Sequence, residues 1–455
     1  MAKPALPKGT RDFLPGEVNR RKYIFGIVEE VFRKYGFLPI ETPAIEALDT
    51  LLGKYGDEGD KLLFKVLNNG DYLKDANADA LDQRDSNALV RSISKRGLRY
   101  DLTVPFARFV VMNQNEIQLP FKRYQIQPVW RADKPQKGRY QEFFQCDVDV
   151  VGSESLLYEA ELVSIYHEIF KRLGIGVKIL INNRKILYGI AEAAGVADRF
   201  VDMTVAIDKL DKIGEEGVSR ELLAKGMQES QIRTILDILS IRQLSELSAH
   251  AEFAKSESGQ KGLEEVNTVF DFLKDGEVHD LVFDISLARG LSYYTGCIFE
   301  VKVDVDIHAD IKMGSIGGGG RYDNLTGAFG LPGVSGVGVS LGAERIYDVL
   351  NELNGFPKEV DEAVRLIFLC FDESGIRHAF NHAAKVRAAG VACDVYPEAR
   401  QMKKQMNYTN NRGIPFAAIL GENEINTQTI MLKNMVSGEQ KAVNIEELIN
   451  LIKGS

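Results

Sequence analysis

The sequence contains few cysteines, and they are widely spaced. Four occur among 455 residues, and no two form a CxxC pair. This argues against a dense disulfide framework, so we expect reduced thiols in a reducing compartment. The first residues lack the apolar core of a secretory signal, and no apolar run approaches the ~20 residues that span a bilayer. The sequence therefore predicts a cytoplasmic protein.

Several common signatures of catalysis are also missing. His378 and His382 are spaced i, i+4, but no HExxH motif or acidic partner accompanies them, so a metal site there is not favoured. The sequence shows no Ser-His-Asp set and no Walker A loop. A formal net charge of −9 excludes a uniformly basic nucleic-acid binder but allows a local basic surface.

Length and composition predict a soluble protein of several domains. Hydrophobic residues make up 45% and charged residues 27%, which is typical of globular chains. Residues 354–363 have the composition of a linker, and strand and helix patterns alternate after it. We therefore predict one domain over 1–358, with a charged helical insertion at about 195–275, and a small α/β domain over 359–455.

Apolar periodicity locates the main elements of the first domain. It predicts helices over 21–37 and 155–174, strands over 98–104, 121–132, 143–152 and 298–306, and a strand leading into a helix over 336–350. Residues 71–97 are polar without a clear period, and we interpret them as a long loop or inserted excursion.

Alternation along the strands separates polar from apolar faces. Gln145, Asp147 and Asp149 fall on one face of the strand at 143–152. Asp101 and Thr103 would likewise share a face of the strand at 98–104. Together these groups could hold an ammonium group and a small polar side chain. A sheet with one solvated face would show the same pattern.

Three further features could bind phosphate. Residues 121–140 contain six Lys and Arg against one Asp, and a basic hairpin with a Pro/Gly tip suits phosphate contacts as well as it suits solvent. The glycine cluster at 314–320 permits close backbone approach to a ligand, or a flexible loop. Arg289 and Arg345 are isolated cations that could meet a phosphate or an ordinary carboxylate.

The order of these motifs is more specific than any one of them. "KGTRDFLPGE", "YGFLPIETPAIE", "LRYDLTVPFAR", "FKRYQIQPVWRADKPQKGRYQEFFQCDVD", "ARGLSYYTG", "GGGRYDNL" and "GVGVSLGAERI" follow one another along the chain. In this order the sequence resembles the histidyl-tRNA synthetases, a family of class II aminoacyl-tRNA synthetases, nearly from end to end. Ser292 stands where many members carry Asp.

The resemblance implies a fold, a reaction and a set of partners. We expect a six-stranded antiparallel catalytic sheet flanked by helices, a homodimer, and a C-terminal anticodon-binding domain with a mixed sheet. The substrates would be L-histidine, ATP with Mg²⁺, and the cognate histidine tRNA. Histidine would first be activated to histidyl-adenylate and then transferred to the 3′ end of the tRNA.

The same resemblance assigns roles to residues. Arg131 and Arg289 would be catalytic and act at the α-phosphate, and Arg345 would hold the outer phosphates. Histidine would be bound by Asp101, Leu102, Thr103, Gln145, Asp149, Tyr293, Tyr294 and Tyr322. ATP would be bound by Arg131, Asp133, Arg139, Phe143, Arg289 and Arg345.

Two other functions share this framework. A synthetase-like regulatory subunit of the first enzyme of histidine biosynthesis would typically have lost signature residues and the C-terminal domain. An ATP-using amide ligase would need neither "RGLSYYTG" nor that domain. Arg131, Arg289, Arg345 and the tail are all present, which favours the synthetase.

Overall fold

The computed structural model describes residues 3–52, 61–288, 293–361 and 364–454. The chain divides into two compact units. Met1–Asp12 and Arg21–Gly355 form the first, and Phe13–Arg20 and Phe356–Ser455 form the second. The division at 355/356 lies close to the domain boundary that the sequence predicts at 358/359.

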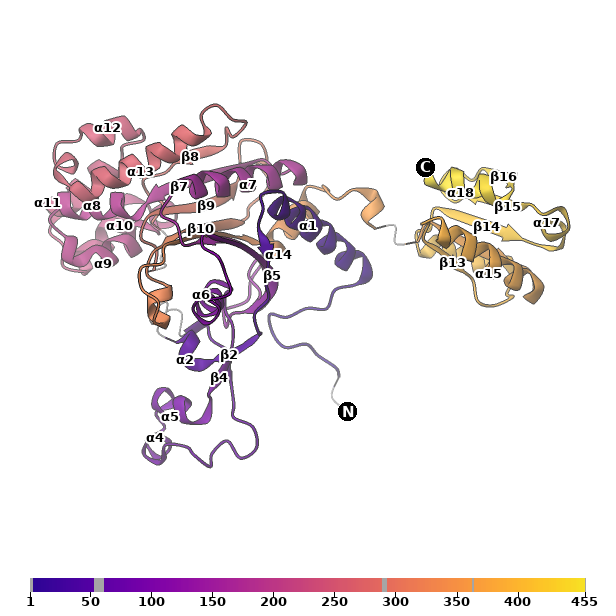
Figure 1. Cartoon of the computed structure of the whole chain (residues 1–455), viewed down its shortest axis with the longest axis horizontal. Coiled ribbons are helices and arrows are strands. Elements are labelled where there is room, and N and C mark those ends of the chain that lie inside the picture. The colour runs from indigo at the N-terminus through magenta and orange to yellow at the C-terminus, as the bar shows by residue number, and fades with distance from the viewer. Residues whose placement is uncertain (1–2, 53–60, 289–292, 362–363, 455) are drawn as a thin grey trace. The chain divides into compact units, whose positions relative to one another are not determined.

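An eight-stranded mixed sheet is the centre of the first unit (Figure 1). Its strand order is β1-β5-β6-β11-β10-β9-β7-β8. These strands are β1 (Leu38–Pro39), β5 (Phe121–Trp130), β6 (Glu142–Val151), β7 (Val177–Asn183), β8 (Leu281–Phe283), β9 (Cys297–Val303), β10 (Gly317–Tyr322) and β11 (Gly336–Gly342).

The prediction of a six-stranded antiparallel sheet is therefore wrong in its strand count and its edges. The six inner strands, in the sheet order β5-β6-β11-β10-β9-β7, do pair antiparallel. At each edge a short strand adds in parallel, β1 on β5 and β8 on β7. These edge strands have two and three residues. A strand that short shows no alternation, so the sequence pattern could not reveal it.

Two predicted segments have a different structure. The expected strand at 98–104 is absent, because β4 (Arg96–Leu98) ends there and helix α6 (Thr103–Met112) begins five residues later. Pro105 lies in the first turn of α6, where a missing N–H costs nothing. The glycine cluster at 314–320 is not a loop throughout, because Gly317–Gly320 form the start of β10.

Helices of the first unit pack on the sheet through the apolar faces that their sequences predict. Ile24, Ile27, Val28, Val31 and Phe32 are all buried on α1. Gly174, at φ 68°, ends α7 as the sequence indicates. Among the described residues, the helices outside the insertion include α1 (Pro15–Lys34), α2 (Leu48–Leu51), α6, α7 (Leu157–Leu173) and α14 (Ala343–Glu352), with a 3₁₀ turn at Thr326–Phe329.

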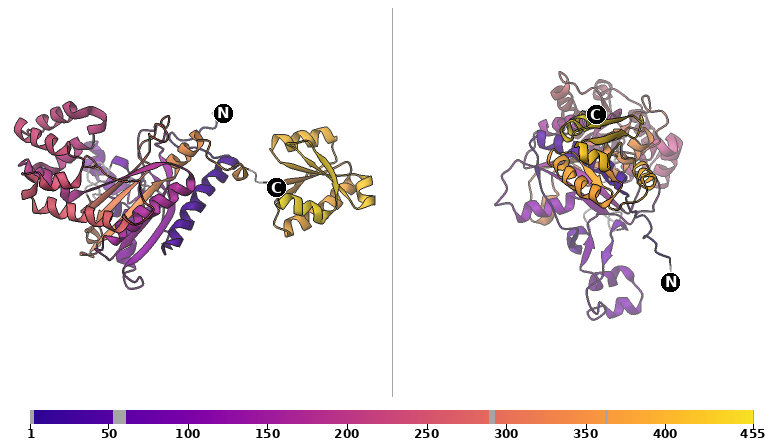
Figure 2. Two further views of the ribbon diagram at one scale, coloured as in Figure 1. Left: turned by 90° about the horizontal axis from the view of Figure 1, so that it is seen from above. Right: turned by 90° about the vertical axis from the view of Figure 1, so that its right-hand side faces the viewer.

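The segment before α6 carries a projecting excursion. It contains a three-stranded antiparallel sheet of β2 (Ile45–Ala47), β4 and β3 (Lys65–Val66), with helices α4 (Ala78–Asp82) and α5 (Ser86–Ile93) at its end. Figure 1 and the right-hand view of Figure 2 show α4 and α5 standing away from the eight-stranded sheet. The expected loop over 71–97 is thus partly helical.

Between β7 and β8 the chain forms helices joined by short connections, without a strand among its described residues. Figure 1 shows these helices grouped beside the β7–β8 edge of the sheet. They are α8 (Arg184–Ala193), α9 (Phe200–Ile207), α10 (Leu210–Ala224), α11 (Glu229–Leu239), α12 (Leu244–Ala249) and α13 (Glu257–Leu273), with 3₁₀ turns at Ala197–Arg199 and Phe253–Lys255. Among the residues that the structure describes, no helix is long and apolar enough to cross a membrane.

The second unit is an α/β domain with a five-stranded mixed sheet, as the sequence predicts. The strand order is β13-β12-β14-β15-β16, parallel among the first three and antiparallel after that. Its elements are β12 (Leu366–Cys370), α15 (Glu373–Ala388), β13 (Cys393–Val395), α16 (Met402–Asn411), β14 (Phe416–Leu420), α17 (Glu422–Thr427), β15 (Ile430–Asn434), β16 (Gln440–Val443) and α18 (Ile445–Lys453), after a 3₁₀ turn at Lys358–Val360.

Candidate active site

One cavity of about 300 Å³ lies over the middle strands of the large sheet. Its lining comes from β6, β10 and β11, from the turn between β5 and β6, and from the chain before α6. Most predicted site residues meet there: Asp101, Thr103, Arg131, Asp133, Arg139, Phe143, Gln145, Asp149, Tyr293, Tyr294, Tyr322 and Arg345. Leu102 is fully buried beside them and does not line the cavity. Arg289 and Ser292 lie outside the described residues.

Asp101 enters the cavity from the start of a helix and not from a strand. Its Oδ1 accepts a hydrogen bond from the Val104 amide at 3.3 Å, in the first turn of α6. Burial raises the pKa of the Asp101 carboxyl to about 7, and the charge of Asp147 adds to the increase. The guanidinium of Arg131 opposes it. An ionised Asp101 is therefore costly here unless a cation joins it.

The alternation predicted for β6 is confirmed. Gln145, Asp147 and Asp149 all line the cavity, whereas Cys146, Val148 and Val150 are at most 1% exposed and pack in the core. Polar residues of β5 stand directly opposite, in the pairs Arg123–Asp149, Gln125–Asp147 and Gln127–Gln145. Two neighbouring strands thus supply a polar floor.

Arg123 lies within this floor. It is one of the six Lys and Arg in residues 121–140, but its side chain is 0% exposed, so it faces neither a phosphate nor solvent. Its Nη2 is 2.7 Å from Asp149 Oδ2, and its guanidinium lies over the Phe106 ring at 4.2 Å. This pairing depends on the register of β5 against β6, which places Arg123 directly opposite Asp149.

Asp149 has a second partner in Tyr322, whose hydroxyl donates to Oδ1 at 2.6 Å. Burial raises the pKa of Asp149, while Arg123 and this hydrogen bond lower it. Gly338 on β11 makes the space for the carboxyl, because a Cβ at Gly338 would lie 1.9 Å from Asp149 Oδ1. A side chain at this glycine would displace the carboxylate.

Three tyrosines form one wall of the cavity. The rings of Tyr293 and Tyr294 are 4.5 Å apart between centroids, and Tyr293 meets Tyr322 edge-on at 6.2 Å. The Tyr293 hydroxyl donates to that of Tyr294 at 3.2 Å. Tyr294 is 8% exposed, and Gly320 leaves room for its ring, since a Cβ there would be 2.8 Å from Tyr294 Cδ1.

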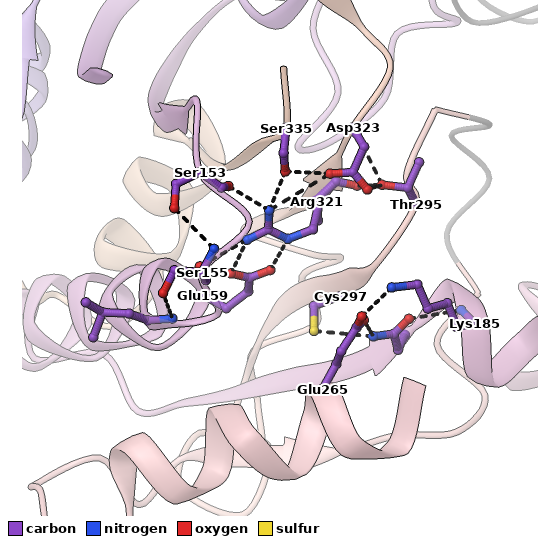
Figure 3. Close-up of polar contacts among 12 residues, drawn as sticks. Ser153, Ser155, Glu159, Lys185, Glu265, Thr295, Cys297, Arg321, Asp323 and Ser335 are labelled. Carbon is purple, nitrogen blue, oxygen red and sulfur yellow. Dashed lines mark hydrogen bonds and ion pairs between the residues drawn. The ribbon is translucent and has the colours of Figure 1, made fainter. Parts of the chain in front are cut away.

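A polar network around Arg321 fixes the backbone next to these tyrosines (Figure 3). Arg321 forms a two-pronged ion pair with Glu159 of α7, with both nitrogen–oxygen distances at 2.6 Å. Ser335 and Thr295 each donate to the Asp323 carboxylate at 2.5 Å, and the Thr295 amide donates to the Arg321 carbonyl at 2.8 Å. Tyr294 and Tyr322 are therefore held by chain neighbours that are locked to each other.

Cations gather toward the hairpin between β5 and β6. The Arg131 guanidinium lies 5.3 Å from the Phe143 ring centroid, and its Nε donates to the Tyr100 carbonyl at 2.8 Å. Arg345, in the first turn of α14, donates to the carbonyls of Gly138 (2.8 Å) and Ser315. Arg139 lies 3.8 Å from Asp133 and is half exposed. This end of the cavity suits a polyanion beside an aromatic ring.

Metal ligands are not concentrated at the site. Within residues 3–52, 61–288, 293–361 and 364–454, no group of three or more His, Cys, Asp or Glu side chains could hold a metal ion. Glu344 lines the cavity, but its carboxylate is taken by Arg21 at 2.8 Å and by the Phe144 amide at 2.9 Å.

Known proteins share the whole of this architecture. The family profile described as histidyl-tRNA synthetase matches residues 9–346, and the profile described as anticodon binding domain matches residues 371–455. The chain is 54% identical to a histidine–tRNA ligase of Bacteroides fragilis (strain YCH46) over 457 residues, covering 99% of each chain. The chain belongs to the histidyl-tRNA synthetase family.

Solved members of the histidyl-tRNA synthetase family show the same fold. The crystal structure of histidyl-tRNA synthetase from Nostoc sp. PCC 7120 matches with a TM-score of 0.83 and 30% identity, over 100% of both chains. A histidine–tRNA ligase of Porphyromonas gingivalis (strain ATCC BAA-308 / W83) is 53% identical over 97% of each chain. The class II synthetase fold is thereby established for this chain, with eight strands in its large sheet.

Proposed function

We propose that this member of the histidyl-tRNA synthetase family is a histidine–tRNA ligase that acts in two steps. A carboxylate oxygen of L-histidine attacks the α-phosphorus of ATP, the bond to the bridging oxygen breaks, and pyrophosphate leaves. A hydroxyl of the terminal adenosine of the cognate tRNA then attacks the carbonyl of histidyl-adenylate, and AMP leaves. The single observation that carries this proposal is one cavity with two chemically different ends.

The end over β6 is suited to an amino acid with a hydrogen-bonding ring. Asp101, Thr103 and Gln145 would hold the backbone groups of histidine there, beside the backbone of Leu102. Asp149 and Tyr294 would hold the two imidazole nitrogens, with Tyr293 and Tyr322 as walls. A carboxylate and a phenol can accept and donate as the ring requires. An apolar amino acid would leave these buried groups without partners, which is the basis of strong discrimination.

The other end is suited to a nucleotide. Phe143 would stack on the adenine, and Arg131 would bind the α-phosphate. Asp133, Arg139 and Arg345 would hold the remainder of ATP, which we take to arrive with Mg²⁺ on its phosphates. Arg289 would stabilise the charge that develops at the α-phosphorus, by its place in the "ARGLSYYTG" motif. Arginines fixed by backbone carbonyls, as Arg131 and Arg345 are, need little rearrangement to do this.

The remaining assignments concern the whole molecule. Residues 1–358 would form the catalytic domain and residues 359–455 the domain that binds the anticodon, which agrees with the profile match at 371–455. The enzyme would work as a homodimer in the cytoplasm. Reduced cysteines support that compartment, since three of the four are buried and all are unpaired.

ATP–pyrophosphate exchange with each of the twenty amino acids tests this function. Exchange should depend on L-histidine and on Mg²⁺, and the other amino acids should give little. Exchange with a different amino acid but not with histidine would contradict the assignment. Exchange without charging of the histidine tRNA would instead point to an amide ligase on the same fold.

A further inference from the structure

Asp147 is a buried carboxylate that the assignments above leave without a role. It lines the cavity between Gln145 and Asp149, and it is 2% exposed. Its Oδ1 has no hydrogen-bond partner among the described residues, and neither has Oε1 of Gln145. Leaving a buried acceptor unsatisfied typically costs ~1–3 kcal/mol, so native structures rarely keep two side by side.

The two unpartnered oxygens belong to side chains that converge on Ser340 of β11. Gln145 donates from Nε2 to the Ser340 hydroxyl at 3.0 Å. Ser340 stands directly opposite Asp147 in the β6–β11 register and hydrogen-bonds its carboxylate. Ser340 therefore accepts the hydrogen bond of the Gln145 amide nitrogen and also hydrogen-bonds the Asp147 carboxylate. Oε1 of Gln145 and Oδ1 of Asp147 are left as two hydrogen-bond acceptors on the cavity floor.

Asp101 adds a third acceptor. It lines the same cavity, and the charge of Asp147 acts directly on the Asp101 carboxyl. An ammonium group carries three N–H donors and no acceptor. Two carboxylate oxygens and one amide oxygen therefore match it in number, polarity and charge.

The charge balance points to the same ligand group. Three carboxylates, Asp101, Asp147 and Asp149, lie at this end among the residues that the structure describes. Two guanidiniums compensate them, Arg123 and Arg131, which act on these carboxyls as neighbouring charges. Burial raises the pKa of all three carboxyls in spite of these arginines, so a further cation at this end would favour their ionised forms. Asp149 is different, because it already has a direct counter-ion in Arg123, whose Nη2 lies 2.7 Å from its Oδ2.

We propose that Asp147 is a further histidine-binding residue whose Oδ1 accepts a hydrogen bond from the α-ammonium group, alongside Asp101 and Gln145. The proposal rests on the proposed function, because it concerns how the same cavity holds its amino acid. It assigns Asp147 to the ammonium and leaves the imidazole to Asp149. Arg123 is then the buried cation that favours the ionised form of both carboxyls, which lie two residues apart on one strand.

The test compares Asp147→Asn with the wild type on three ligands. L-histidine and L-histidinol carry the ammonium group, and imidazolepropionate has the ring without it. Dissociation constants come from calorimetry, and inhibition constants from histidine-dependent exchange. The variant should bind L-histidine and L-histidinol ~10- to 100-fold more weakly, as expected for a lost hydrogen bond to a charged group. Its inhibition by imidazolepropionate and its KM for ATP should change less than ~3-fold.

Two outcomes would overturn the proposal. One is an unchanged affinity for L-histidine, and the other is an equal loss for imidazolepropionate, which would place Asp147 at the ring or in the fold. Inhibition constants do not depend on the fraction of folded enzyme, so partial misfolding cannot imitate the expected selectivity. Asp304→Asn is a control at the residue directly after β9 and outside the cavity, and it should change the affinity for neither ligand class. A wild type that shows no histidine-dependent exchange would instead refute the proposed function.

Discussion

Replacing Asp101 by asparagine should make the ligand-free protein more stable at alkaline pH. Burial raises the Asp101 pKa from 3.8 to about 7. A carboxyl whose pKa is higher in the folded state favours folding while it stays protonated, and that contribution is lost as the pH rises through the folded pKa. The shift spans about three pH units, each equivalent to ~1.4 kcal/mol. Ionising Asp101 therefore costs the folded protein ~4 kcal/mol.

Asp101→Asn keeps the size of the side chain and the oxygen that accepts from the Val104 amide, but it cannot ionise. The stability difference between variant and wild type should therefore be small near pH 4. It should grow by ~1.4 kcal/mol per pH unit up to about pH 7 and then level off at ~4 kcal/mol in favour of the variant. Histidine binding should be lost in the same protein, because the ammonium would meet an amide instead of a carboxylate.

Urea unfolding at a fixed protein concentration measures this difference. Trp130 is the chain's single tryptophan and ends β5, so its fluorescence reports on the large sheet and not on the C-terminal unit. A stability difference that does not change with pH would refute the reasoning, as would a variant that is less stable at every pH. Either result would mean that Asp101 finds compensation for its charge in the ligand-free protein.

Three other perturbations follow from the site. Tyr322→Phe removes the 2.6 Å hydrogen bond to Asp149, which should weaken histidine binding ~10-fold by the usual worth of a bond to a charged group, with an unchanged ATP KM; an equal rise in both constants would contradict that role. Arg289→His should slow adenylate formation ~100-fold in single-turnover assays while histidine binding and the melting temperature stay near wild type; a lowered melting temperature with normal activation per folded molecule would make Arg289 structural. Deleting residues 363–455 should leave adenylate formation largely intact and severely reduce tRNA charging, measured on a preparation shown to be folded and dimeric; normal charging would give the second unit another role.

Local patterns in the sequence predicted the elements that have a repeating signal. The apolar face of α1, the alternation along β6, the strand-to-helix transition at β11 and α14, and the α/β order of the second unit are all confirmed. These segments are long enough for the period of a helix or a strand to appear. The two edge strands were not predicted, because two or three residues are too few to show a period. The strand expected at 98–104 is wrong, because β4 ends at Leu98 and α6 begins at Thr103.

The cavity was only partly predictable. Motif order grouped the residues of α6, β6, β10 and α14, and the structure brings them together. It could not show that Arg123 is buried against Asp149, because that depends on the register of β5 against β6. Nor could it show that Asp147 keeps an oxygen without a partner, since Ser340 arrives from a strand almost 200 residues away in the sequence.

The sequence by itself determined the family and the chemical types of group at the site, because side-chain identity and order are local properties of the chain. Tertiary structure alone decided which charges are paired. Asp149 acquires Arg123 and Tyr322, whereas Asp101 and Asp147 are desolvated with less compensation. The physical reason is that the energy of a buried charge depends on the neighbours within a few ångströms, and strand pairing and helix packing bring those neighbours from distant parts of the chain.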